Sequence, residues 1–110
     1  MEKVRYSPEK LTTFVRDLFR AAGVGESEAS EVATSLIESN LRGHESHGVL
    51  RVGDYLDGLR TGELCSGVEW QVLTETPAVL VADGRRGFGQ VLARRLVVAL
   101  AEKCRPLGIA

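Results

Sequence analysis

The chain has 110 residues, with 14 Lys and Arg against 15 Asp and Glu, which gives a formal net charge of −1. A hydrophobic fraction of 44% and a charged fraction of 26% are typical of a folded globular domain and exclude a disordered chain. The balanced charge argues against a protein that coats nucleic acid, and no apolar run reaches the ~20 residues of a membrane helix. The charged N-terminus is unlike a secretory signal, so we expect a cytoplasmic protein in which Cys65 and Cys104 are reduced thiols.

Apolar residues at offsets of three and four predict three helices in the first half of the chain, at about residues 8–22, 28–42 and 49–60. Ser7 is a favourable N-cap, Pro8 suits the first helical position, and Gly23 is typical of a helix end. A short turn joins the first two helices, which predicts an antiparallel pair with facing apolar stripes.

The second half of the chain predicts two strands and a fourth helix, at about residues 69–74, 78–82 and 90–104. Alternating residues around Trp70 indicate the first strand, and the continuous apolar run of the second is typical of a strand covered on both faces. Pro106 is expected to end the last helix, and Ile109-Ala110 to begin a further strand. We therefore expect a mainly α-helical chain with a short β segment.

Reactive side chains concentrate in residues 42–51, which we call the histidine segment and which holds both histidines of the chain. Histidine has an unperturbed pKa near neutrality, so it can take and return a proton. Ser46 stands beside His47 and can hydrogen-bond to the same substrate oxygen. Arg51 lies four residues after His47, so on a helix that starts near Gly48 both side chains would project to similar sides. The pattern fits a small 2-hydroxy or 2-keto acid, with the planar guanidinium on its carboxylate and His47 on the adjacent oxygen.

Two other interpretations of the histidine segment compete with proton transfer. If the segment is only a polar loop between helices, its histidines are solvated and have no catalytic role. The position of a residue in a fold does not by itself give it a chemical function. A metal site is disfavoured, because residues 44–47 read H-E-S-H rather than H-E-x-x-H and no third ligand or second cluster is visible.

Residues 84–89 are rich in glycine and stand between the second predicted strand and the last helix, which is the context of a phosphate-binding turn. The G-x-G-x-x-G pattern is not complete, because Leu92 stands where the third glycine would be, and no acidic residue follows at a strand end. We therefore interpret these glycines as structural and predict no Rossmann site. The nearby arginines are interpreted as a solvated basic face; they are Arg85, Arg86, Arg94 and Arg95.

The run L-R-G-H-E-S-H-G-V-L-R at residues 41–51, followed by Tyr55, resembles the N-terminal signature of the malate/L-lactate dehydrogenase family of the non-Rossmann type. That family includes ureidoglycolate and sulfolactate dehydrogenases. Residues 75–84 and 87–90 resemble the family's next block, so the resemblance covers nearly the whole chain in the expected order. It implies an α/β fold with a mixed sheet, an N-terminal helical part, and active sites completed across a homodimer.

The resemblance also implies a reaction, the transfer of a hydride between NAD or NADP and a small 2-hydroxy acid such as malate or lactate. It makes His47 the proton-transferring or substrate-orienting histidine, Ser46 its hydrogen-bonding neighbour and Arg51 the carboxylate-binding arginine. His44 and Tyr55 fall within the matched stretch and are further candidates for substrate binding. Some members carry a second candidate acid/base in a downstream Asn-x-x-His segment, so the choice between that histidine and His47 stays open.

Members of this family are several-fold longer than 110 residues. We therefore expect residues 1–110 to be the N-terminal part of such an enzyme, with most of the cofactor site outside it and no activity when isolated. The competing hypothesis is a non-catalytic helical interaction module that exposes an apolar face. A DNA-binding helix–turn–helix is disfavoured, because the helix predicted up to Leu41 is acidic.

Overall fold

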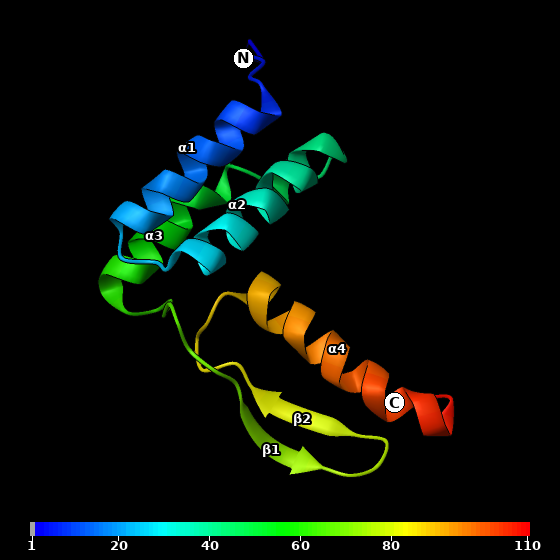
Figure 1. The fold of residues 1–110 in the computed structure, drawn as a ribbon. Helices are drawn as coiled ribbons and strands as arrows, with labels where there is room; N and C mark the ends of the chain where they lie inside the picture. The colour runs from blue at the N-terminus through cyan, green and yellow to red at the C-terminus, as the bar shows by residue number, and fades with distance from the viewer. Residues whose placement is uncertain (1) are drawn as a thin grey trace.

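The computed structural model describes residues 2–110, whose elements form two lobes (Figure 1). Three α-helices and a short 3₁₀ helix, η1, make up one part, which we call the helical lobe. A two-stranded hairpin and a long helix make up the other, which we call the hairpin–α4 lobe. The expectation of a mainly helical chain with a short β segment is confirmed by the elements, which in chain order are α1 (Pro8–Ala21), α2 (Glu26–Leu41), η1 (Glu45–His47), α3 (Arg51–Thr61), β1 (Gln71–Glu75), β2 (Leu80–Asp83) and α4 (Gly89–Leu107).

Helix α1 begins where the capping signals predict. The Oγ of Ser7 accepts a hydrogen bond from the backbone N–H of Lys10 at 3.3 Å, and Pro8 is the first helical residue. The same hydroxyl donates to Oε2 of Glu9 at 2.7 Å, which holds the pKa of that carboxyl below its ordinary value. Four residues then connect α1 to α2, and the two helices pack side by side (Figure 1).

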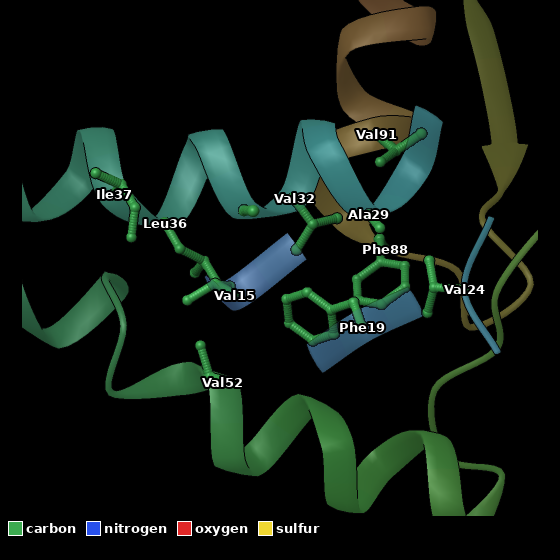
Figure 2. Close-up of a cluster of buried hydrophobic side chains, with 11 residues drawn as sticks. Val15, Phe19, Val24, Ala29, Val32, Leu36, Ile37, Val52, Phe88 and Val91 are labelled. Atoms are coloured by element: carbon green, nitrogen blue, oxygen red, sulfur yellow. The ribbon is translucent and has the colours of Figure 1, made fainter. Parts of the chain in front are cut away.

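One buried core holds the helical lobe together (Figure 2). At its centre the ring of Phe19 meets that of Phe88 edge to face, with centroids 5.8 Å apart, and Tyr55 lies 5.9 Å from Phe88. Because Phe88 stands just before α4, the start of that helix is anchored in the helical lobe. The core comprises Val15, Phe19, Val24, Ala29, Val32, Ala33, Leu36, Ile37, Val52, Phe88 and Val91.

The hairpin pairs β1 with β2 in antiparallel register, from Gln71 opposite Asp83 to Glu75 opposite Leu80, with an irregularity between Val72 and Thr74. Both strands thus start about two residues later than predicted. The prediction that the second strand is covered on both faces is wrong: Leu80 and Ala82 are half-buried, whereas Val81 is exposed. The reason is that β2 has one partner strand, and no second layer of described residues covers its other face.

Three predicted helix ends are displaced. Helix α2 begins at Glu26 and α3 at Arg51, each two residues from the predicted start. Helix α4 continues through Pro106 to Leu107, so the prediction that Pro106 ends it is wrong. A proline in the last turn removes one hydrogen bond only, and the helix instead ends at Gly108, which adopts a left-handed φ of 80°.

The two lobes together make an extended molecule. The radius of gyration is 16.1 Å, against about 13 Å for a compact domain of this length. The accessible surface is 7658 Å², against roughly 6,000 Å² for a monomer of this size. The excess in accessible surface is area that a compact domain of this size would bury. No helix within residues 2–110 combines the length and apolar character needed to cross a membrane.

Candidate functional site

Helix α2 delivers the chain into the histidine segment through a tight C-terminal turn. The backbone N–H of His44 donates to the carbonyl of Ser39 at 2.8 Å, and that of Gly43 donates to the carbonyl of Asn40 at 3.0 Å. This pattern requires a left-handed residue after the helix, and Gly43 has a φ of 83°, which costs glycine no Cβ clash. The turn therefore sets the direction in which the chain leaves α2 and enters η1.

Ser46 and His47 form a hydrogen-bonded pair in η1. The Oγ of Ser46 lies 2.9 Å from Nδ1 of His47, and both side chains are exposed. The hydroxyl can donate to a bare Nδ1 or accept from a protonated one, so the pair is compatible with either tautomer. In either case Nδ1 is occupied, which leaves Nε2 as the ring nitrogen available for proton exchange with a bound molecule.

The side chain of Arg51 reaches back to the turn that holds Ser46 and His47. Its Nε donates to the backbone carbonyl of Ser46 at 2.8 Å. The helix that was predicted to start near Gly48 begins instead at Arg51, and residues 48–50 form a turn between it and His47, the last residue of η1. The guanidinium nevertheless reaches back, so the structure brings together Ser46, His47 and Arg51.

The guanidinium of Arg51 is partly occupied by an acidic residue that the sequence reasoning missed. Its Nη1 lies 3.0 Å from Oδ2 of Asp54, one helical turn along α3. The i, i+3 spacing of opposite charges was the available signal. Both side chains are substantially exposed, so the pair is weak and a substrate carboxylate can compete with Asp54 for the fork.

The other two candidates lie differently. The side chain of His44 is exposed, and its carbonyl accepts the N–H of His47 at 3.0 Å. The ring of Tyr55 packs against Phe19 and Phe88, and its hydroxyl accepts a hydrogen bond from Nε2 of Gln90 at 2.9 Å. Tyr55 therefore links α3 to the start of α4, a contact between distant parts of the chain that no local pattern predicted.

A groove of about 860 Å³ runs beside the histidine segment, between the N-terminal residues and helices α1 and α2. Its walls include Lys3 and Glu45, which form an exposed ion pair at 2.9 Å. Ser46, His47 and Arg51 are not part of its lining. In residues 2–110 these three side chains thus lie on an open surface rather than inside a pocket.

The glycine-rich turn is closed by its own protein contacts. The N–H of Gly87 donates to the carbonyl of Gly84 at 2.9 Å, and a Cβ on Gly87 would meet Cδ1 of Leu92 at 2.7 Å. These contacts agree with structural glycines, because a phosphate cradle needs open backbone N–H groups. The N–H of Gly87 is thus not open to a phosphate, and this turn does not fit the pyrophosphate of a nicotinamide dinucleotide.

Two of the four neighbouring arginines form ion pairs. Arg94 lies 3.3 Å from Glu31 on α2, and Arg95 lies 3.7 Å from Glu69. The interpretation of a merely solvated basic face is thus incomplete, since two of the four arginines tie α4 to other segments. Among residues 2–110, no three His, Cys, Asp or Glu side chains are grouped so that they could hold a metal ion.

Comparison with known proteins gives the family. The family model described as malate/L-lactate dehydrogenase matches residues 6–110. The chain is 37% identical to malate dehydrogenase of Pyrococcus abyssi and 36% identical to hydroxycarboxylate dehydrogenase B of Escherichia coli, each over 96% of this chain and 29% of the relative. Its fold matches the solved malate dehydrogenase of Pyrococcus horikoshii with a TM-score of 0.88 and 33% identity, over 96% of this chain and 30% of that one.

The chain belongs to the malate/L-lactate dehydrogenase family, which confirms the resemblance inferred from the histidine segment. It spans about three tenths of the length of the curated relatives that it matches. The names of these relatives are those of 2-hydroxy acid oxidoreductases.

Proposed function

We propose that this chain supplies the substrate-orienting part of an oxidoreductase that interconverts a small 2-hydroxy acid and the corresponding 2-keto acid. The observation that carries the proposal is the arrangement of the Ser46–His47 pair with Arg51, whose Nε bonds the backbone of the same turn. A proton-exchanging ring and a cation held on the same turn match the two polar groups of a 2-hydroxy acid.

The chemistry divides between these side chains. Arg51 binds the substrate carboxylate, which displaces Asp54 from Nη1 and forms a bidentate contact with the guanidinium. His47 serves the neighbouring oxygen: its Nε2 takes the hydroxyl proton on oxidation and returns it on reduction. Ser46 orients the ring through Nδ1. The hydride acceptor is a nicotinamide, NAD or NADP, held by residues outside those described.

The hairpin–α4 lobe is where the remainder of such an enzyme packs. Its exposed apolar side chains and the large total surface support this proposal, because a lone domain seldom leaves such a face open. We further infer a homodimer and a cytoplasmic location, on family membership and the absence of a membrane-spanning helix in residues 2–110. The exposed large apolar residues of the hairpin and α4 are Val72, Leu73, Val79, Val81, Val97, Val98 and Leu107.

The test is a hybrid enzyme, in which this chain replaces the matching three tenths of the Pyrococcus horikoshii malate dehydrogenase. We expect oxaloacetate- or pyruvate-dependent oxidation of NADH or NADPH by the hybrid and none by the 110-residue chain. His47→Gln should lower kcat by about 10²–10⁴-fold. Glu45→Gln is the control, because its carboxylate contacts Lys3 rather than the pair. Near-normal kcat in His47→Gln would remove His47 from proton transfer, and turnover by the isolated chain would refute the proposed division of the site.

A non-catalytic interaction module is the second candidate, and the exposed apolar side chains of the hairpin–α4 lobe favour it. The distinguishing measurement is sedimentation of the isolated chain over a hundredfold dilution. A stable oligomer, together with an inactive hybrid, would support the module. A monomer whose hybrid is active would support the dehydrogenase.

A further inference from the structure

One side chain of α2 reaches the histidine segment directly. The Oδ1 of Asn40 accepts a hydrogen bond from the backbone N–H of Val49 at 2.8 Å, across nine residues of sequence. Within residues 2–110 it is the one side-chain hydrogen bond between α2 and the histidine segment. Asn40 is half-buried and lies in the last turn of α2, which is anchored in the core through Leu36 and Ile37.

The same carboxamide explains why residue 48 is a glycine. A Cβ built on Gly48 would overlap the carboxamide of Asn40, whose nitrogen also lies only 3.1 Å from that position. Gly48 is buried and has a negative φ of −99°, so close approach rather than backbone conformation excludes a side chain here. Asn40 and Gly48 therefore form one contact in which the side chain sits directly on the backbone of the turn.

This contact lies between the two groups that the proposed reaction needs. Val49 is two residues after His47 and two residues before Arg51. All three residues of η1 are exposed, so no buried side chain within it fixes its place, and short 3₁₀ turns have weak intrinsic stability. The N–H of Val49 is thus a side-chain-held point at which the turn is fastened to α2, next to the packing of the Val49 side chain against the core.

We propose that Asn40 is a positioning residue, which sets the placement of His47 relative to Arg51 by holding the backbone at Gly48 and Val49. The inference rests on the proposed function and deepens it. A misplacement of about 1 Å between reacting groups is enough to cost on the order of 10²-fold in rate, so the loss of one fastening point should appear in kcat.

The first experiment measures amide hydrogen exchange on the full 110-residue chain and needs no enzymatic activity. Asn40→Ala should accelerate exchange of the Val49 N–H at least tenfold, because its acceptor is removed. Asn40→Asp keeps an acceptor oxygen and should stay within about threefold of the original chain. Ser39→Ala is the matched control: its hydroxyl bonds Ser35 within α2, while its carbonyl still receives His44. Unchanged exchange at Val49 in Asn40→Ala would overturn the proposal.

The second experiment measures kinetics in the hybrid enzyme. Asn40→Ala should lower kcat at least tenfold while the KM for the nicotinamide stays within twofold, and Asn40→Asp should restore kcat to within about threefold. Fast exchange at Val49 with an unchanged kcat would also overturn the proposal, since Asn40 would then stabilise the turn without setting the placement of His47. A hybrid that is inactive with the original sequence counts against the proposed function, whereas the exchange result still decides whether Asn40 holds the segment.

The third arm uses the close approach at Gly48. Gly48→Ala should lower kcat in the hybrid by about as much as Asn40→Ala, because the new methyl group displaces the carboxamide. When both substitutions are combined, Gly48→Ala should add less than threefold, since the group it collides with is gone. Fully multiplicative losses would show that the two residues act independently and would contradict the shared contact.

Discussion

Apolar residues of the same type can be buried in the helical lobe and exposed in the hairpin–α4 lobe. Leu36 in the helical lobe is 1% exposed, whereas Leu73 in the hairpin–α4 lobe is 59% exposed. In the helical lobe the apolar faces of α1 and α2 pack against each other and against parts of α3 and α4, so their apolar surface is removed from water. The hairpin has two strands and one half-covered face. A residue pattern therefore sets the element, but the presence of a neighbouring layer decides how much that element stabilises the fold.

The comparison bears on the candidate site. The histidine segment is carried entirely by the helical lobe, where a buried core supports the end of α2 and the start of α3. The hairpin–α4 lobe contributes Gln90, which bonds the hydroxyl of Tyr55 behind the segment. We therefore expect the site to be ordered in the chain alone, even where the hairpin is only marginally stable.

The largest predicted effect contrasts the two leucines. Leu36→Ala removes a fully buried side chain and should lower the free energy of unfolding by about 2–5 kcal/mol. Leu73→Ala should change it by less than about 0.5 kcal/mol, because its side chain is largely in water already. Urea unfolding of the 110-residue chain measures both. Similar losses for the two variants would mean that the hairpin face is covered in solution, for example by a second copy.

An intermediate effect is expected at the junction between the lobes. A Cβ on Gly87 would press on Leu92 and Val68, so Gly87→Ala should cost about 1–3 kcal/mol and loosen the entry to α4. The matched control is Gly89→Ala, where nothing lies within 4 Å of the added methyl group and helix propensity should raise stability slightly. Thermal unfolding followed by circular dichroism distinguishes the two, and a neutral Gly87→Ala would contradict the packed turn.

The smallest predicted effect concerns the exposed start of α1. Ser7→Ala removes the cap and should cost on the order of 0.5–1 kcal/mol at neutral pH. Ser7 also lowers the pKa of Glu9, so that contribution is present above the ordinary pKa of the carboxyl and is lost as the pH falls through its depressed value. The difference in stability between the original chain and Ser7→Ala should therefore shrink as the pH falls below the ordinary pKa of a glutamate carboxyl.

Ser27→Ala is the control for that measurement, since Ser27 lies in the first turn of α2 and caps no helix. Its effect on stability should be smaller than that of Ser7→Ala and should not change over the same pH range. A pH-independent difference for Ser7→Ala would show that the hydroxyl does not act on Glu9.

The helices of the first half of the chain could be predicted because their signals are local. The stripe that includes Val32 and Leu36 repeats with the helical period, and Ser7 and Gly23 mark ends through bonds within a few residues. The two strands were predicted in the correct order with ends off by about two residues. The coverage of the second strand was predicted wrongly, because a continuous apolar run shows only that a strand could be covered on both faces and not that it is.

The sequence by itself determined the identity of the chemical groups: a histidine beside a serine, an arginine four residues on, and a resemblance that the family match confirms. Only the tertiary structure decided that Arg51 bonds the carbonyl of Ser46 and that Tyr55 faces Gln90. It also placed the carboxamide of Asn40 on the backbone of the turn. The physical reason is that the contacts of Tyr55 with Gln90 and of Asn40 with Val49 depend on how whole elements pack, and that of Arg51 on the path of the turn after η1. No periodicity or spacing within one segment records that placement.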